Sequence, residues 1–194
     1  MSIENIKKML LDSVDAKTKS AELLAGDIQR CAEISAESLK NGGKLLFCGN
    51  GGSAADSQHL ATELVVRLSD KFDRPALKAV ALTTDSSILT ACANDFGFES
   101  IFSRQIEAIG NKGDILFAIS TSGNSLNIIN AVESAKLKGL MVVGFLGGDG
   151  GSLKTLVDYP IVAPSIDTAR IQECHITFGH IIIAVIEDIL FSKK

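Results

Sequence analysis

The chain has 194 residues, of which 46% are hydrophobic and 22% are charged, a composition typical of one folded domain. Its net charge is −4 and its basic residues are scattered, which predicts that nucleic acid is not a partner. No apolar run reaches the roughly 20 residues that cross a membrane, and the amino-terminal residues lack the apolar core of a signal peptide. We therefore expect a cytoplasmic protein with no membrane partner. Widely spaced cysteines predict small core residues and no disulfide or thiolate metal site: Cys31, Cys48, Cys92 and Cys174.

Residues 3–40 carry apolar residues at helical spacing and are predicted to be helical throughout. Gly26 is expected to break this segment into two helices, and Gly42 and Gly43 to end the second one. A minimal doubly wound unit does not need helices before its first strand. We therefore interpret residues 1–43 as a contact between subunits of an oligomer.

From residue 45 onward, short apolar runs alternate five times with helical segments. The strands are expected at residues 45–48, 77–84, 114–120, 140–146 and 159–163. The helices are expected after residue 53, at 86–93, 100–109 and 125–137, from 152, and at 168–191, with a turn at 94–97. This alternation predicts an α/β fold, a three-layer, doubly wound, five-stranded parallel sheet with right-handed crossovers. The amino-terminal helical segment is added to it.

The stretch 44–68 combines a strand, a glycine turn and the start of a helix. The turn consists of Asn50, Gly51, Gly52 and Ser53. Because the first N–H groups of a helix lack internal partners, this arrangement favours an anion. His59 and Glu63 follow four residues apart, so they share one face of the helix.

The third strand ends in a second loop suited to anions. Four hydroxyls surround a glycine there, in the order Ser120, Thr121, Ser122, Gly123, Asn124 and Ser125. Hydroxyls and free N–H groups bind a phosphate monoester without lysine. Neither loop has the lysine of a P-loop or the GxGxxG dinucleotide fingerprint. Since loops after parallel strands meet at one edge of the sheet, we favour phosphate binding over an ordinary helix cap.

The last predicted helix offers further polar groups. Gln172 and His180 are eight residues apart, an offset of ~80° around the helix, so they are expected to flank one cavity. His175 lies off that line and is expected to pack locally. An HxxxE pair alone is a weak metal signal. With the last helix, however, His59, Glu63, Gln172 and His180 predict either a metal shell of nitrogen and oxygen ligands or an acid–base group.

Five motifs now form a specific set: CGNGGS, the HxxxE helix, NDFGF at 94–98, ISTSGNS and ARIQECH…GH. Over nearly the whole chain, they resemble the phosphoheptose isomerases of the sugar-isomerase (SIS) domain family. The resemblance implies one SIS domain over residues 1–194 with a flavodoxin-like strand order. It implies an aldose–ketose isomerase that converts D-sedoheptulose 7-phosphate to D-glycero-D-manno-heptose 7-phosphate, for the heptose of lipopolysaccharide core, S-layer or capsule. It also implies a homotetramer with sites near subunit interfaces.

The same resemblance implies roles for individual residues. Zinc would be held by His59, Glu63, Gln172 and His180. The phosphorylated seven-carbon sugar would contact Asn50, Gly51, Gly52, Ser53, Glu63, Asn94, Asp95, Ser120, Thr121, Ser122, Ser125 and Gln172. Isomerisation needs a carbon base and a proton carrier, which we assign to Glu63 and His180, with a metal as Lewis acid. The two tasks of Glu63 conflict, because a bound cation weakens a carboxylate as a base.

Two positions depart from the family pattern and are expected to edge the site, Ala169 and Leu146. The main alternative is a SIS branch that binds the bacterial replication initiator protein as a regulatory tetramer. That branch is not expected to keep both the helix carboxylate and the final-helix histidine, so Glu63 and His180 favour the enzyme. A third interpretation is a SIS module that senses a sugar phosphate, which would need the serine loop without Glu63.

Overall fold

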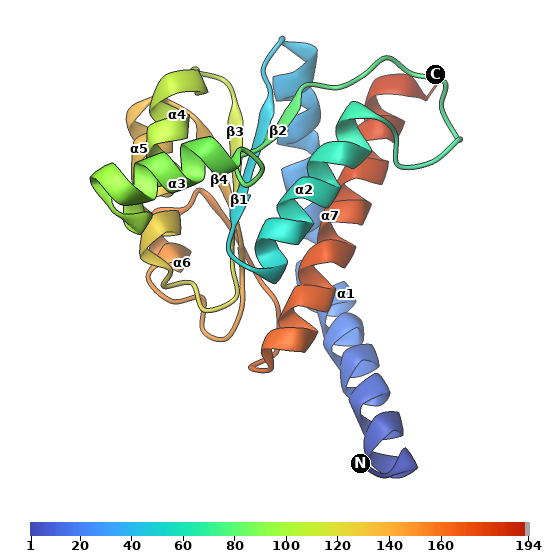
Figure 1. The fold of residues 1–194 in the computed structure, drawn as a ribbon. Helices are drawn as coiled ribbons and strands as arrows, with labels where there is room; N and C mark the ends of the chain where they lie inside the picture. Colours follow the sequence, from blue (N-terminus) through green and yellow to red (C-terminus); the bar gives the residue numbers. More distant parts are fainter. Residues whose placement is uncertain (193–194) are drawn as a thin grey trace.

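The centre of the protein is a five-stranded parallel sheet with helices on both faces (Figure 1). The computed structural model describes residues 1–192. The strand order is β2-β1-β3-β4-β5, the flavodoxin-like order of a doubly wound sheet, which confirms the predicted fold class. The strands are β1 (Leu45–Gly49), β2 (Ala79–Ala81), β3 (Ile115–Ser120), β4 (Met141–Leu146) and β5 (Tyr159–Val162).

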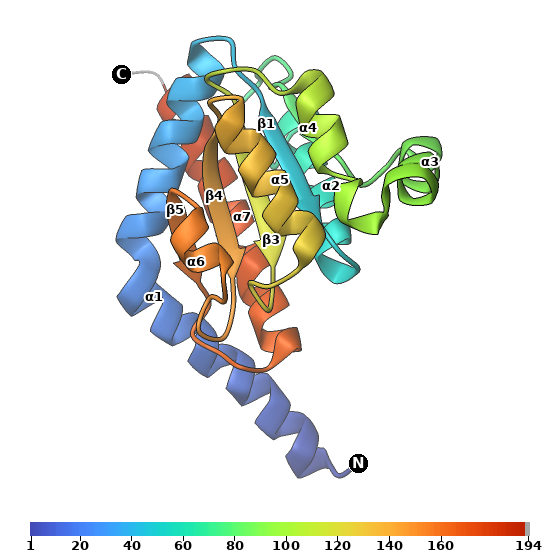
Figure 2. The ribbon, with the colours of Figure 1, turned by 90° about the vertical axis from the view of Figure 1, so that its left-hand side faces the viewer.

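Two hydrophobic clusters, one on each face of the sheet, form the core. Along β1, Leu45 and Phe47 point to one face, and Leu46 and Cys48 point to the other. Figure 2 looks onto the second face, with α5 in front of the sheet and α7 behind it. The first face is covered by α1 (Ile3–Lys40), α2 (Gly52–Val65) and α7 (Thr168–Phe191). The second is covered by α3 (Ser86–Phe96), η1 (Phe98–Ser100), α4 (Ser103–Ile109), α5 (Leu126–Leu137) and α6 (Leu153–Leu156).

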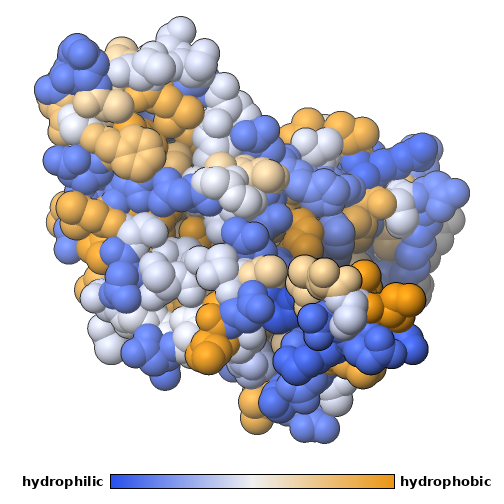
Figure 3. Space-filling model, turned by 60° about the horizontal axis from the view of Figure 1, so that its bottom comes forward, coloured by the Kyte–Doolittle hydropathy of each residue, from blue (hydrophilic) through white to orange (hydrophobic). Residues whose placement is uncertain are grey.

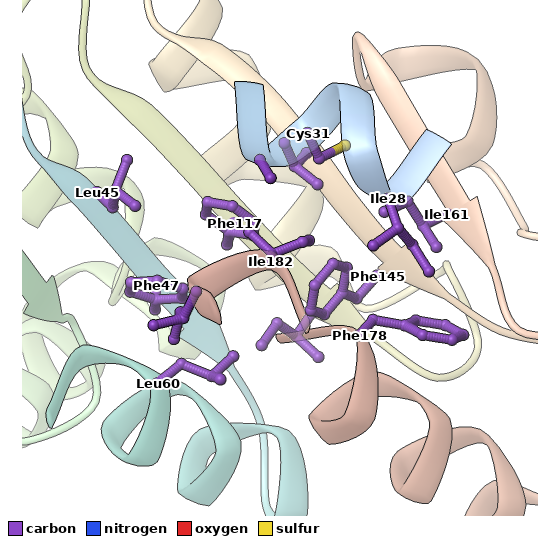
Figure 4. Packing of buried hydrophobic residues seen from close by; sticks show 14 of the residues in the cluster. Ile28, Cys31, Leu45, Phe47, Leu60, Phe117, Phe145, Ile161, Phe178 and Ile182 are labelled. Carbon is purple, nitrogen blue, oxygen red and sulfur yellow. The ribbon is translucent and has the colours of Figure 1, made fainter. Parts of the chain in front are cut away.

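Aromatic packing fixes α7 against the sheet (Figure 4). The Phe47 and Phe117 rings of the sheet stack at 4.9 Å between centroids, and Phe145 meets Phe117 edge-on at 5.7 Å. Phe178 of α7 meets Phe145 edge-on at 6.2 Å. Between the helices, a Cβ at Gly179 would collide with the Leu60 side chain. Glycine at this position therefore lets α2 and α7 approach closely, which matters because both helices carry site residues.

Four predictions about element boundaries were wrong. Gly26 does not break α1, because a glycine inside an exposed helix costs only about 1 kcal/mol and the helix continues to Lys40. The strand expected at 77–84 is reduced to Ala79–Ala81, an edge strand that pairs only with β1. The predicted turn at 94–97 is instead the last turn of α3, which ends where Gly97 takes a φ of 91°. The helix expected at 100–109 is divided into η1 and α4.

The amino-terminal part of α1 extends beyond the rest of the molecule (Figures 1 and 2). Its apolar side chains are exposed: Ile3, Ile6, Met9, Leu10, Leu11 and Val14. The later turns pack on α7 and the sheet through residues such as Ile28 and Cys31. An apolar stripe on an otherwise solvated helix needs a partner for burial.

Within residues 1–192, one helix, α7, is long and apolar enough by composition to cross a membrane. It packs between α1, α2 and the sheet and buries Ile182, Ile183 and Ile186 in the core. The same composition is typical of the core helix of a globular protein.

Candidate functional site

The glycine turn and the serine loop lie side by side because β1 and β3 are neighbours in the sheet. The Asn50 amide donates to Asn127 Oδ1 at 2.9 Å, and the Asn127 amide donates back to Asn50 Oδ1 at 2.8 Å. Asn127 is buried on the first turn of α5. This reciprocal pair connects the two loops, and sequence analysis did not predict it. The available signal was a polar residue on a buried helix position.

The serine loop, residues 120–125, is fixed by its own contacts. Ser120 is buried and donates to Ser125 Oγ at 3.2 Å. Gly123 has a φ of +66°, and a Cβ there would collide with the backbone of Gly150, so only glycine fits. Ser125 precedes α5 without a side-chain capping bond, which leaves amide groups of the first turn for a ligand. Figure 3 brings this end of the molecule forward and shows a pale area of near-zero hydropathy, the colour of glycine, serine and threonine.

Gln172 lies against the glycine turn. A Cβ at Gly52 would be 2.5 Å from Gln172 Nε2, so the amide touches the first turn of α2. His59 is seven residues further along α2, about 10 Å along the axis. The structure therefore places Gln172 beside the predicted sugar-binding turn and apart from the histidines. Its predicted role as a metal ligand remains a prediction.

His59, Glu63 and His180 converge between α2 and α7, and we call them the trio. His59 Nε2 lies 2.8 Å from His180 Nε2 and 3.3 Å from Glu63 Oε1. One ligand atom from each residue lies within 4.8 Å of the others. Two imidazole nitrogens and a carboxylate oxygen are a donor set that zinc accepts. The same atoms also suit proton transfer, because Glu63 is largely buried and half-buried His180 lies beside it.

Burial lowers the pKa of His180, and the charge of His59 lowers it further, while Glu63 opposes both effects. These effects favour the neutral imidazole, in which one ring nitrogen accepts a proton and the other donates one. Asp56, one turn before His59, was not predicted. Burial raises the pKa of its carboxyl to about 6, against the effect of His59, and its Oδ2 is buried without a hydrogen-bond partner.

Asn94 and Asp95 lie on exposed surface of α3, and the Asn94 side chain donates to Asp95 Oδ1 at 2.7 Å. In both ribbon views α3 lies apart from the α2–α7 pair (Figures 1 and 2). Within one chain, the structure therefore leaves these two predicted substrate contacts away from the trio.

His175 and the four cysteines are buried, as expected from the sequence. His175 is buried near Phe145 and Phe178, with Nε2 2.8 Å from the Leu146 carbonyl oxygen, and burial lowers its pKa to about 4. All four cysteines are buried free thiols. Burial raises the pKa of Cys31 and of Cys48 to about 12, which makes them inert core residues.

Comparisons with known proteins agree with this geometry. Residues 11–147 match the SIS domain. A phosphoheptose isomerase of Burkholderia pseudomallei is 51% identical over 89% of this chain and 87% of its own length. The chain belongs to the phosphoheptose isomerase family of SIS-domain proteins.

Solved structures of this family superpose closely. The phosphoheptose isomerase of Francisella tularensis is 38% identical, with a TM-score of 0.93 over 97% of this chain and 99% of its own. The phosphoheptose isomerase of Neisseria gonorrhoeae is 41% identical, with a TM-score of 0.90 over 95% of this chain and 98% of its own. These matches cover the glycine turn, the serine loop and both helices of the trio, and they do not favour the initiator-binding branch.

The two departures from the family pattern differ in their surroundings. Ala169 is exposed on the first turn of α7, where its N–H donates to the capping carboxylate of Asp167 at 2.8 Å. Leu146 is fully buried in the core below α5 and α6. Leu146 pairs with Ser120 in the sheet and so lies at the edge of the site, as expected. Its side chain points into the core, however, and its carbonyl contacts His175, so it does not alter sugar contacts directly.

Proposed function

We propose that this protein is an aldose–ketose isomerase that converts D-sedoheptulose 7-phosphate to D-glycero-D-manno-heptose 7-phosphate. The observation that carries the proposal is the position of Glu63, a largely buried carboxylate beside two histidines, in a chain half identical to phosphoheptose isomerases. The product is a precursor for the heptose of lipopolysaccharide core, S-layer or capsule.

The reaction moves a carbonyl from C2 to C1. Glu63 removes a proton from C1 of the ketose, which gives an enediol, and returns a proton to C2. His180 moves the second proton from the C1 oxygen to the C2 oxygen. Neutral His180 suits this step, because one ring nitrogen accepts a proton while the other donates. The reaction needs no other reactant.

Substrate binding falls to the loops. We propose that the phosphate binds at Ser120, Thr121, Ser122 and Ser125, whose hydroxyls and amides supply donors without charge. The sugar chain runs along Asn50, Gly51, Gly52 and Ser53 toward the trio. Gln172 contacts it there, because its amide already lies against Gly52.

Zinc fits the donor set of the trio. His59, Glu63 and His180 would hold the ion. Gln172, whose amide lies against Gly52, is proposed as a fourth ligand on the family resemblance alone. When bound, zinc would polarise the substrate carbonyl as a Lewis acid.

A homotetramer in the cytoplasm is the proposed working form, with residues 1–43 of the single domain 1–194 as a subunit contact. The exposed apolar stripe of α1 supports this assembly. The exposed position of Asn94 and Asp95 fits a site shared between subunits, in which these residues reach the substrate of a neighbour.

The proposal is tested by incubating purified protein with sedoheptulose 7-phosphate, with and without added zinc, and following new aldose signals by NMR. We expect conversion by the wild-type protein and strongly slowed conversion by Glu63→Gln. Absence of conversion under both conditions would overturn the isomerase assignment and leave the initiator-binding or sensing alternatives.

A further inference from the structure

Arg74, in the connection between α2 and β2, is a buried cation that the reaction does not use. Its side chain is 1% exposed, and its Nε donates to Glu187 Oε1 of α7 at 2.6 Å. Glu187 is itself 3% exposed. A charge is almost never buried this fully without a partner, so the two residues depend on each other.

The other nitrogens of Arg74 bind the end of α2. Nη2 donates to the carbonyl oxygen of Glu63 at 2.8 Å, and Nη1 donates to that of Leu64 at 2.9 Å. The last carbonyls of a helix lack partners within the helix, and a positive charge is favourable there. One guanidinium therefore holds the backbone of Glu63 on one side and α7 on the other.

This link spans the two helices that carry the trio. His59 and His180 meet at 2.8 Å across the helix interface, and Glu187 lies about two turns beyond His180. Gly179, next to His180, packs directly on Leu60, next to His59. The relative position of α2 and α7 is therefore fixed by close packing at the level of the trio and by the planar fork of Arg74 beyond it.

A buried ion pair is weak evidence for stability, because removing both charges from water costs about as much as their attraction returns. Its best-attested role is to specify register. Here the register concerned is that of α2 against α7. A shift of these helices would separate the Glu63 carboxylate from His180 without unfolding the sheet.

We propose that Arg74 and Glu187 are positioning residues that hold Glu63 and His59 against His180. This inference rests on the proposed function, since it assigns the pair to the alignment of that site. Neither residue touches the substrate, and the phosphate-binding loop belongs to other elements, β3 and α5.

Two variants test the role. Arg74→Lys keeps the charge beside Glu187 but lacks the fork that reaches both carbonyls, and Glu187→Gln keeps an acceptor but removes the charge. We expect kcat to fall roughly 10–100-fold in each, as for residues that orient catalytic groups, with the KM for sugar phosphate nearly unchanged.

The matched control is Asp114→Asn, which removes the carboxylate from a second buried ion pair, Lys44–Asp114. Asp114 also accepts from the backbone N–H of Lys44 and Asn111, at the amino ends of β1 and β3, away from the loops. It should lower the melting temperature while leaving kcat unchanged.

A second readout does not depend on activity. The chain has three histidines, so the ring nitrogen signals of His59, His180 and His175 are readily separated by NMR in zinc-free protein at pH 8. We expect the Nε2 signals of His59 and His180 to shift in Arg74→Lys and Glu187→Gln but not in Asp114→Asn, with His175 constant throughout.

The inference is overturned if Arg74→Lys and Glu187→Gln keep both the wild-type kcat and the wild-type His59 and His180 signals and lose only stability, as Asp114→Asn does. A wild-type protein without isomerase activity would refute the proposed function instead. The ring signals would still decide whether Arg74 and Glu187 align the trio.

Discussion

The site consists of two regions with opposite chemistry. The α2–α7 pair carries every titratable group of the trio, whereas the loops after β1 and β3 contain only asparagine, glycine, serine and threonine at residues 50–53 and 120–125. The side chains of the proposed phosphate site do not titrate near neutral pH, so we expect phosphate binding there to be independent of any protonation change in the protein. In the proposed reaction, phosphate binding and proton transfer therefore reside on different elements, and we expect that each can be disturbed separately.

The largest expected effect comes from the helix pair. Glu63→Gln removes the carbon base and should lower kcat by roughly 10²–10⁴-fold, while sugar phosphate still binds to the loops. Turnover is followed by NMR and binding by calorimetry. Glu133→Gln, an exposed change on α5, serves as the control. Near-normal turnover of Glu63→Gln would remove Glu63 from the mechanism.

A change in the serine loop should raise KM and leave kcat nearly unchanged, the reverse of the change at Glu63. Ser120→Ala removes a hydroxyl from the proposed phosphate site, and hydrogen bonds to charged groups contribute about 1.5–3 kcal/mol, so KM should rise at least about tenfold. We expect kcat to change little, because the trio is intact. Ser134→Ala, later on α5, is the matched control. A fall in kcat at constant KM would contradict the separation of the two regions.

The amide pair between the loops gives a smaller effect on turnover. Asn127→Ala removes both hydrogen bonds to Asn50, which should lower the free energy of unfolding by about 1–3 kcal/mol and raise KM a few-fold. Denaturant titration and steady-state kinetics measure the two quantities. Loss of stability with an unchanged KM would show that the pair supports the fold without shaping the sugar site.

The smallest effect on activity concerns His175, which shares α7 with His180 but faces the core. Its pKa is about 4 in the folded state and 6.5 in the unfolded state, so folded protein binds fewer protons. The stability from its burial is complete above pH 6.5 and is lost as the pH falls toward 4, in total about 3 kcal/mol. His175→Gln should flatten this part of the pH–stability curve, measured by urea titration, without altering kcat at pH 7. The difference between the two proteins isolates His175 from Asp56, whose raised pKa acts in the opposite direction.

Local sequence patterns located most of the fold. The apolar runs predicted all five strands, and the last helix was predicted with the observed bounds, Thr168–Phe191. The pattern failed where a weak local preference was outweighed by the surrounding helix, as at Gly26, where α1 continues without a break. Edge strand β2 was overestimated because an apolar run does not reveal how many residues find a pairing partner.

The candidate site was predictable where the spacing of residues along a helix sets the direction of their side chains. It was less predictable where the distance between residues decides whether they meet. Spacing put His59 and Glu63 on one face, and the structure brings His180 to them. Gln172 has a suitable direction but lies about 12 Å from His180 along α7, at the level of Gly52. Asn127 and Arg74 were missed because their partners Asn50 and Glu187 lie 77 and 113 residues away.

The projecting first turns of α1 make part of the protein's helical structure dependent on protein concentration. An isolated helix of about 15 residues is marginal in water, even with favourable residues. The first turns of α1 expose their apolar side chains, so their helicity draws little support from the rest of the same chain. By mass action, dilution that separates the proposed subunits would then unfold the first turns of α1 before it affects the sheet. The helix content of these turns would therefore report the degree of assembly.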